Sequence, residues 1–150
     1  MRISAKARYG MAAVIKMAQI CGTDKSVTII ELSEMLDISK IYLEQVFALL
    51  KRGGIVTSIK GARGGYLLSR MAKEISVFDI LSAIETSIFE KTETTVNEAN
   101  EDIENAMNDI VFSILDKNLR DTLTIINIED IVNKSNEYKY ENDQNYMYYL

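Results

Sequence analysis

The sequence predicts a mainly α-helical protein with one small β-hairpin. In residues 28–69, two short helical patterns separated by a tight turn precede two β-type runs around a glycine-rich basic loop. Farther along, an apolar helical pattern from about residue 97 to 121 predicts one long helix. The expected architecture is therefore a helix-turn-helix with a hairpin wing, followed by a long helix.

The helix-turn-helix is predicted from capping and periodicity. Ser4 is a plausible N-cap for a first helix over residues 3–21, and Thr28 with Glu31 forms a capping-box pattern for a second helix. The run Asp37-Ile38-Ser39 interrupts the helical pattern, and Ser39 is a suitable N-cap for a third helix from about Lys40 to Arg52. Apolar residues recur in that helix at i, i+3, i+4 and i+7, which predicts a buried stripe of Leu43, Val46, Phe47 and Leu50.

The wing is predicted from the residues after the third helix. Gly53-Gly54 ends that helix, residues 55–59 and 66–68 have strand character, and residues 60–65 form a turn with two cations and three glycines. Glycines allow close backbone approach, and Lys60 and Arg63 suit contact with phosphates or the minor groove. The alternative is a plain hairpin whose cations are only solvated.

The exposed face of the third helix carries Lys40, Ile41, Glu44, Gln45 and Ala48. Glutamine can pair bidentately with adenine, and glutamate can accept a hydrogen bond from cytosine N4. An ordinary solvated helix face is the alternative for this helix taken alone. Helix, turn, helix and basic wing together favour binding to double-stranded DNA.

Charge is unevenly distributed along the 150-residue chain, whose net charge is −5. Residues 1–75 contain twelve Lys and Arg against six Asp and Glu, a net of +6, whereas the remainder has a net of −11. A basic half on an acidic chain is typical of local DNA binding. We expect the acidic half to face away from the duplex.

Residue types exclude several kinds of chemistry. The chain has no His and one Cys, so it offers no imidazole base, no Ser–His or Cys–His pair and no His metal ligand, and we expect no enzyme activity. Cys21 is interpreted as a small buried or boundary residue, with a sensing thiol as the alternative. The apolar run at residues 11–15 is too short for a signal peptide, and no run reaches the roughly 18 residues of a membrane span, so a cytoplasmic protein without membrane contact is expected.

The segments RISAKARYGMAAVIKMA (residues 2–18) and YLEQVFALLKRGGIVTSIKGARGGYLLS (residues 42–69) resemble the Rrf-two family of bacterial winged-helix transcriptional regulators. The resemblance continues to about Ile88 and implies a homodimeric repressor on a palindromic operator. With the helix and wing positions above, it gives the expected DNA-binding residues Arg2, Ser39, Lys40, Tyr42, Glu44, Gln45, Lys51, Lys60, Gly61 and Arg63.

Cluster-binding members of this family carry cysteines in and just beyond the stretch equivalent to residues 86–100, where this chain has neither Cys nor His. Thiolates are the usual anchors of iron–sulfur clusters, so no cofactor is expected. The family's cysteine-metabolism repressor, which resembles this chain in lacking these ligands, is controlled by an enzyme of cysteine synthesis. Docking of such a regulatory protein partner, or a small-molecule or thiol signal, is therefore an alternative mode of control.

The predicted domains are residues 1–88 (winged helix-turn-helix), 89–134 (loop and dimerisation helix) and 135–150 (polar tail). The resemblance implies that the long helix forms the dimer, and its apolar seam predicts contacts through Ile103, Ala106, Met107, Ile110 and Ile114. Residues 123–126 are expected to be extended, and Asn127 to cap a small helix from Ile128 to Lys134. The tail contains five tyrosines, and we favour a frayed end over a strap across a partner.

Overall fold

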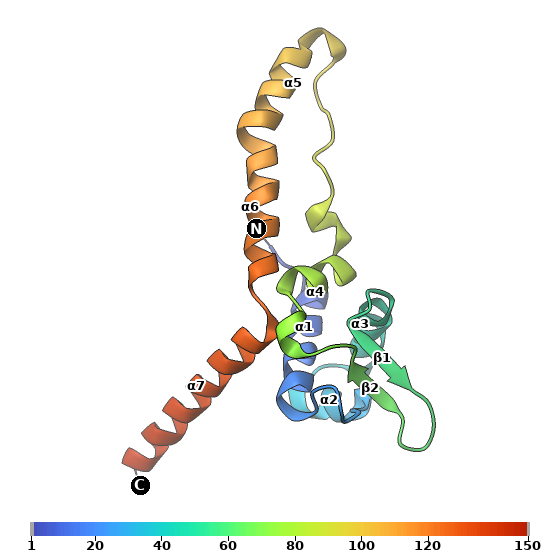
Figure 1. Cartoon of the computed structure of the whole chain (residues 1–150), viewed down its shortest axis with the longest axis vertical. Coiled ribbons are helices and arrows are strands. Elements are labelled where there is room, and N and C mark those ends of the chain that lie inside the picture. The colour runs from blue at the N-terminus through green and yellow to red at the C-terminus, as the bar shows by residue number, and fades with distance from the viewer. Residues whose placement is uncertain (1, 150) are drawn as a thin grey trace.

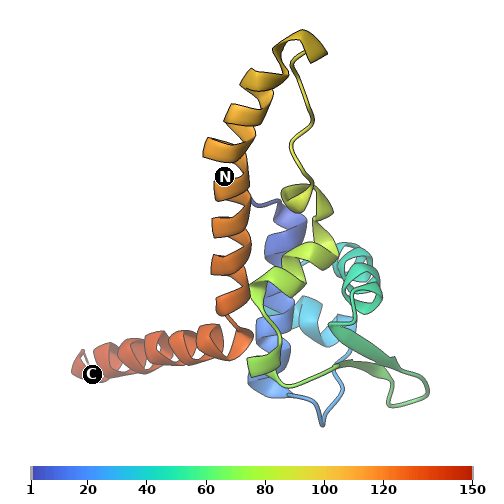
Figure 2. The same cartoon turned by 45° about the horizontal axis from the view of Figure 1, so that its top comes forward.

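In the computed structural model, which describes residues 2–149, a helical domain with a hairpin carries two helices that extend away from it in different directions (Figures 1 and 2). The domain contains three helices, a hairpin, a 3-10 turn and a fourth helix: α1 (Ala5–Ile20), α2 (Ile29–Leu36), α3 (Lys40–Arg52), β1 (Val56–Ile59), β2 (Gly65–Leu68), η1 (Ala72–Glu74) and α4 (Val77–Ile84). The remaining elements are η2 (Thr86–Phe89), η3 (Glu98–Asn100), α5 (Glu101–Met107), a π-helical segment (Asn108–Phe112), α6 (Ser113–Ile125) and α7 (Ile128–Tyr148).

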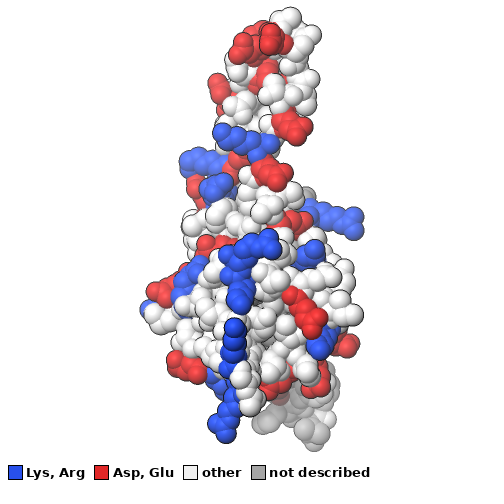
Figure 3. Space-filling view, turned by 90° about the vertical axis from the view of Figure 1, so that its right-hand side faces the viewer, with Lys and Arg blue, Asp and Glu red and all other residues white. Residues whose placement is uncertain are grey.

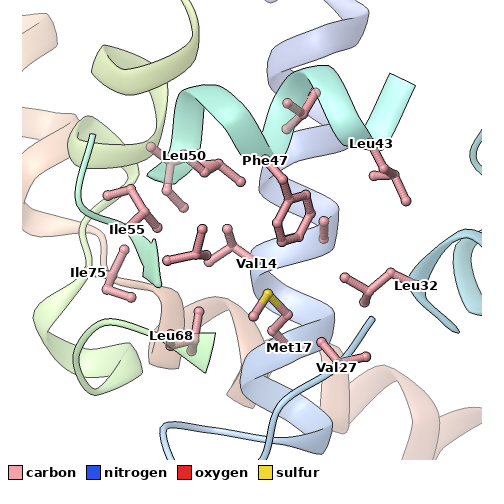
Figure 4. Close-up of a cluster of buried hydrophobic side chains, with 14 of the residues drawn as sticks. Val14, Met17, Val27, Leu32, Leu43, Phe47, Leu50, Ile55, Leu68 and Ile75 are labelled. Carbon is pink, nitrogen blue, oxygen red and sulfur yellow. The ribbon is translucent and has the colours of Figure 1, made fainter. Parts of the chain in front are cut away.

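The hydrophobic core surrounds α1, which packs against α2, α3, α4, α7 and β2. Its buried face consists of Ala7, Gly10, Ala13, Val14 and Met17. In Figure 4, Val14 and Met17 lie among side chains from α2, α3, the hairpin and the segment before α4. The predicted stripe of α3 is confirmed, because Leu43, Val46, Phe47 and Leu50 are all fully buried. Burial of each such side chain stabilises the fold by about 1.5–3 kcal/mol.

Local capping follows the sequence in most places. The Thr28 backbone N–H donates to the Glu31 carboxylate at 2.7 Å, and the Glu31 N–H donates back to the Thr28 hydroxyl at 3.1 Å. Ser4 caps α1 through the Ala7 N–H at 3.1 Å. The expectation for Ser39 is only half right, because it occupies the N-cap position of α3 but its side chain makes no capping hydrogen bond.

The hairpin is antiparallel, with Val56 opposite Leu68 and Ile59 opposite Gly65. Its second strand is also held on its other edge, where the Val27 and Tyr66 N–H groups donate to each other's carbonyls at 3.0 and 2.8 Å. A Cβ at Gly65 would lie 2.6 Å from the Val27 carbonyl oxygen, so this pairing requires glycine there. The base of the wing is thereby fixed to the residues that precede α2.

The long helix differs from its prediction at both ends. It runs from residue 101 to 125 through the π segment, in which the Ser113 N–H donates to the Asn108 carbonyl. The predicted extended piece at residues 123–126 is wrong, because the first three of these residues finish α6. Leu123 packs against the buried cluster of Ala7, Val77 and Leu81, which favours continuing the helix through it.

Helix α7 corrects a second expectation. Asn127 caps it as predicted, through the Asp130 N–H at 3.0 Å, but the helix continues to Tyr148 rather than ending at Lys134. Residues 128–148 contain no Gly or Pro, so nothing in the local sequence stops the helix. Its first turns pack on α1 and η1, and Gln19 donates to the Ser135 hydroxyl at 3.0 Å. Beyond Ser135 every described side chain is exposed.

In residues 2–149, no helix has both the length and the apolar character needed to cross a membrane.

The close approach of α3 and α4 at Gly53 gives a test of the fold. A Cβ at Gly53 would lie 2.5 Å from the Ala83 Cβ, so we expect Gly53→Ala to destabilise the protein by about 1–3 kcal/mol. Urea unfolding followed by circular dichroism measures the change. Gly53→Ala should cost much less in an Ala83→Gly background, which lacks the opposing methyl, than in the wild-type protein; an equal cost in both backgrounds would contradict the steric explanation.

Candidate nucleic-acid interface

Helix α3 presents a solvent-facing surface opposite its buried stripe. Lys40, Ile41, Glu44, Gln45 and Ala48 are all exposed, as the sequence predicts. Lys51 is also exposed, in the last turn of α3. The base-edge donors and acceptors expected from the sequence therefore share one accessible helix face.

Lys40 and Glu44 form an ion pair on this face. The Lys40 Nζ lies 3.6 Å from a Glu44 carboxylate oxygen, and the two side chains are 56% and 51% exposed. Such exposed pairs one turn apart are worth only about 0.3–0.5 kcal/mol. A phosphate or a base can therefore replace either partner at small cost.

The start of α3 lies beside the start of α1. The Tyr42 ring packs edge-on against the Tyr9 ring, with centroids 5.5 Å apart. The two helix starts line a hollow of about 430 Å³ together with Thr86, Ser87 and the end of α4. There the Ser4 hydroxyl donates to the Glu85 carboxylate at 2.9 Å, and Arg2 is exposed just before it. Sequence reasoning missed Tyr9, because no local pattern shows that it meets Tyr42.

The wing tip extends from the same domain. Lys60, Gly61 and Arg63 are exposed, and Gly61 has φ +111°, which favours glycine. The buried Phe47 of α3 packs edge-on against Tyr66 of β2, with ring centroids 4.7 Å apart. This contact fixes the wing relative to α3.

Glu31 at the start of α2 has its pKa lowered, mainly by the hydrogen bond from the Thr28 backbone, so its carboxylate keeps the helix capped at neutral pH.

Charge on this side of the molecule is segregated. Figure 3 shows a row of Lys and Arg running down the lower part of the face that carries α3 and the hairpin, whereas acidic side chains gather at the far end of the arm. The net charges of +6 for residues 1–75 and −11 for the remainder predict this separation.

The residues predicted for dimer contact lie on the arm that α5, the π segment and α6 form. Ile103, Ile110 and Ile114 are 48%, 73% and 50% exposed, Ala106 is exposed, and Met107 is half-buried. The π segment adds a residue to one turn, so the apolar surface does not follow the uniform spacing that the sequence suggests. Val111 and Leu115 add to this exposed apolar surface.

Residues 3–134 match the family model Rrf2, described as an iron-dependent transcriptional regulator. The chain belongs to the Rrf2 family. It is 32% identical to the transcriptional regulator IscR of Pectobacterium carotovorum over 89% of this chain and 80% of that protein. Among solved structures, CymR, the global cysteine regulator of B. subtilis, matches with a TM-score of 0.71 and 28% identity over 89% of this chain and 98% of that one. T. potens IscR matches with a TM-score of 0.70 and 27% identity over 92% and 90%. The Rrf2 fold confirms the winged-helix prediction.

The iron dependence in the Rrf2 description raises the question of whether these residues fit an iron centre. A hollow lies between α5 and the loop that precedes η3. It contains no thiol or imidazole and is lined by Thr94, Val96, Asn97, Glu98, Glu101, Glu104 and Asn105. Glu104 already accepts the Val96 N–H at 3.2 Å. Within residues 2–149, no three His, Cys, Asp or Glu side chains converge as a metal site would require. The residues therefore do not fit an iron–sulfur cluster.

Cys21 is the C-cap residue of α1, and burial raises its pKa above the ordinary value. Its thiolate fraction is therefore small at neutral pH. We expect Cys21 to react slowly with a disulfide reagent at pH 7 and faster as the pH rises, measured by thiolate release with Cys21→Ser as the blank. Rapid reaction at pH 7, with a change in DNA affinity that Cys21→Ser abolishes, would instead identify a sensing thiol.

Proposed function

We propose that this Rrf2-family regulator is a repressor that binds a palindromic operator as a homodimer and uses no iron–sulfur cluster. One observation carries the DNA-binding part: an exposed polar face on α3 and a basic wing, held in a fixed relation by the contact between Phe47 and Tyr66. Repression follows most simply from a bound dimer that occupies the promoter. The cluster-free part rests on the absence of His and of any Cys besides Cys21.

In the proposed complex, the N-terminal turns of α3 enter the major groove, and the wing lies on the backbone or in the minor groove. Glu44 and Gln45 read base edges, and Tyr42, Ser39 and Lys40 support the start of the helix against the duplex. Lys60 and Arg63 contact phosphates or the minor groove, with Gly61 allowing close approach. Arg2 and Lys51 add cationic contacts at the two sides of the interface.

The operator is identified by sequencing the DNA that the protein binds, and the roles are then separated by titration. We expect Lys60→Ala and Arg63→Ala to weaken binding to operator and scrambled duplex alike, and loss of a phosphate contact to lower the salt slope by roughly one. Gln45→Ala and Glu44→Ala should relax specificity at particular positions, by about 1–3 kcal/mol for a good bidentate contact. Each relaxed position should recur in both half-sites.

A matched control is Lys139→Ala, which removes one exposed cation from α7, far along the chain from the wing. It should leave both affinities unchanged. If Gln45→Ala and Glu44→Ala lowered affinity for operator and scrambled duplex equally, α3 would not be the base reader.

The homodimer is supported by the arm. Ile103, Ile110 and Ile114 expose roughly half or more of their side chains on a helix that projects from the domain (Figures 1 and 2). An apolar surface of this kind on a projecting helix favours burial against another protein, and a second copy offers the same surface.

We therefore expect the purified protein to sediment as a colourless dimer, and Ile110→Asp to shift it toward monomer, because a charge would be buried in the interface. The matched control is Asn105→Asp, which adds the same charge on the side of α5 that faces Thr94 and Val96. Analytical ultracentrifugation at micromolar concentration measures the state. A monomeric wild-type protein would contradict the dimer, and visible absorption after anaerobic cluster reconstitution would contradict the cluster-free assignment.

A second candidate concerns control rather than DNA binding. The resemblance to the family's cysteine-metabolism repressor and the exposed tyrosines of α7 favour regulation by a docking protein, such as an enzyme of cysteine synthesis. Retention of such an enzyme by the full chain, and its loss when Tyr138 and Tyr146 are replaced by Ser, would support this mode of control.

A further inference from the structure

An apolar side chain stands at the centre of the proposed base-reading surface. Ile41, the second residue of α3, is 68% exposed, more than any other large hydrophobic residue between residues 2 and 100. It belongs to neither hydrophobic cluster of the described residues. Its position on the helix is opposite the buried stripe of Leu43, Val46, Phe47 and Leu50, so packing within the protein does not explain why it is isoleucine.

The neighbours of Ile41 place it among the proposed base readers. Gln45 and Ala48 follow at i+4 and i+7, so the three side chains share one side of the helix. On the two flanks, Lys40 is paired with Glu44 and Tyr42 is packed on Tyr9. Ile41 therefore occupies the middle of the surface, in the first turn, where recognition helices meet base edges.

We propose that Ile41 reads the 5-methyl group of a thymine in the major groove, which makes it a specificity-determining residue. The isoleucine side chain has no hydrogen-bond donor or acceptor, so it can interact favourably with a base edge only through an apolar contact. In the major groove the thymine methyl is the apolar group that distinguishes one base pair from the others. Four residues of helix rise about 6 Å, which is less than two base steps, so the thymine lies within about two base pairs of the position that Gln45 reads.

This inference rests on the proposed function, and its test removes individual thymine methyl groups from the DNA. Each thymine of the operator is replaced in turn by deoxyuridine, in both half-sites, and the dissociation constant is measured by fluorescence anisotropy. We expect one position per half-site at which the loss of the methyl weakens binding about fourfold, or roughly fifteenfold for both half-sites together. Ile41→Ala should bind the thymine and deoxyuridine operators equally, and Ile41→Val should keep part of the difference.

The controls remove exposed apolar side chains from the neighbouring helix α2. Met35→Ala and Ile30→Ala remove apolar side chains of α2 that are 50% and 55% exposed, and both variants should keep the thymine preference. Thermal unfolding checks that Ile41→Ala is folded, as its exposure leads us to expect.

The outcomes separate the two proposals. If no duplex is bound specifically, the proposed function fails and this inference with it. If the operator is bound but no thymine is sensitive to methyl loss, or if Ile41→Ala keeps the sensitivity, only the role of Ile41 is overturned.

Discussion

The rest of the structure depends on how closely α1 can approach α3 and α4. A Cβ at Gly10 of α1 would lie 2.2 Å from the Ile84 Cδ1 of α4 and 2.9 Å from a Val46 methyl of α3, so a larger residue at this position would require the Ile84 side chain to move. Because α1 also packs on α2, α7 and β2, its small-residue face sets the relative positions of nearly every element of the domain. The inner face of α3 is fully buried in the core, so this packing fixes the angle at which α3 presents its outer face.

The same packing makes α4 the connection between the arm and α3. On one side, Ala83 of α4 approaches Gly53 at the end of α3. On the other, Phe78 packs against Phe89 with ring centroids 4.7 Å apart, and the Arg120 guanidinium of α6 lies 4.8 Å above the Phe78 ring. A displacement of α6 or of the residues after α4 therefore acts directly on α4. Close-packed interiors transmit such shifts instead of absorbing them, which gives an arm of this kind a physical route to α3.

Local signals in the sequence predicted the elements that local interactions determine. The capping box of Thr28 and Glu31 and the buried stripe of α3 both depend on residues within seven positions of each other, and both were confirmed. The end of α6 was mispredicted because Leu123 gains its burial from residues far along the chain, and β-branched residues at 124–126 gave a misleading strand signal. The π segment has no sequence signature of this kind. In the candidate interface, the exposure of Glu44 and Gln45 was predictable from periodicity, whereas the pairing of Tyr9 with Tyr42 requires the tertiary fold.

The acidic character of the whole chain is compatible with a DNA-reading surface because the two charges are separated in space. The arm from residue 101 to 125 is about 37 Å long at 1.5 Å per residue, and Figure 1 shows it leading away from α3 and the hairpin. At physiological ionic strength the Debye length is about 8 Å, so acidic side chains at the far end of the arm are largely screened from α3 and the hairpin. The charges that remain near α3 are those of its own half of the chain, where Lys40 is paired with Glu44 and Lys60 and Arg63 are exposed on the wing. The sign of the field around α3 and the wing therefore follows the net charge of +6 on residues 1–75 more than the net charge of the whole protein.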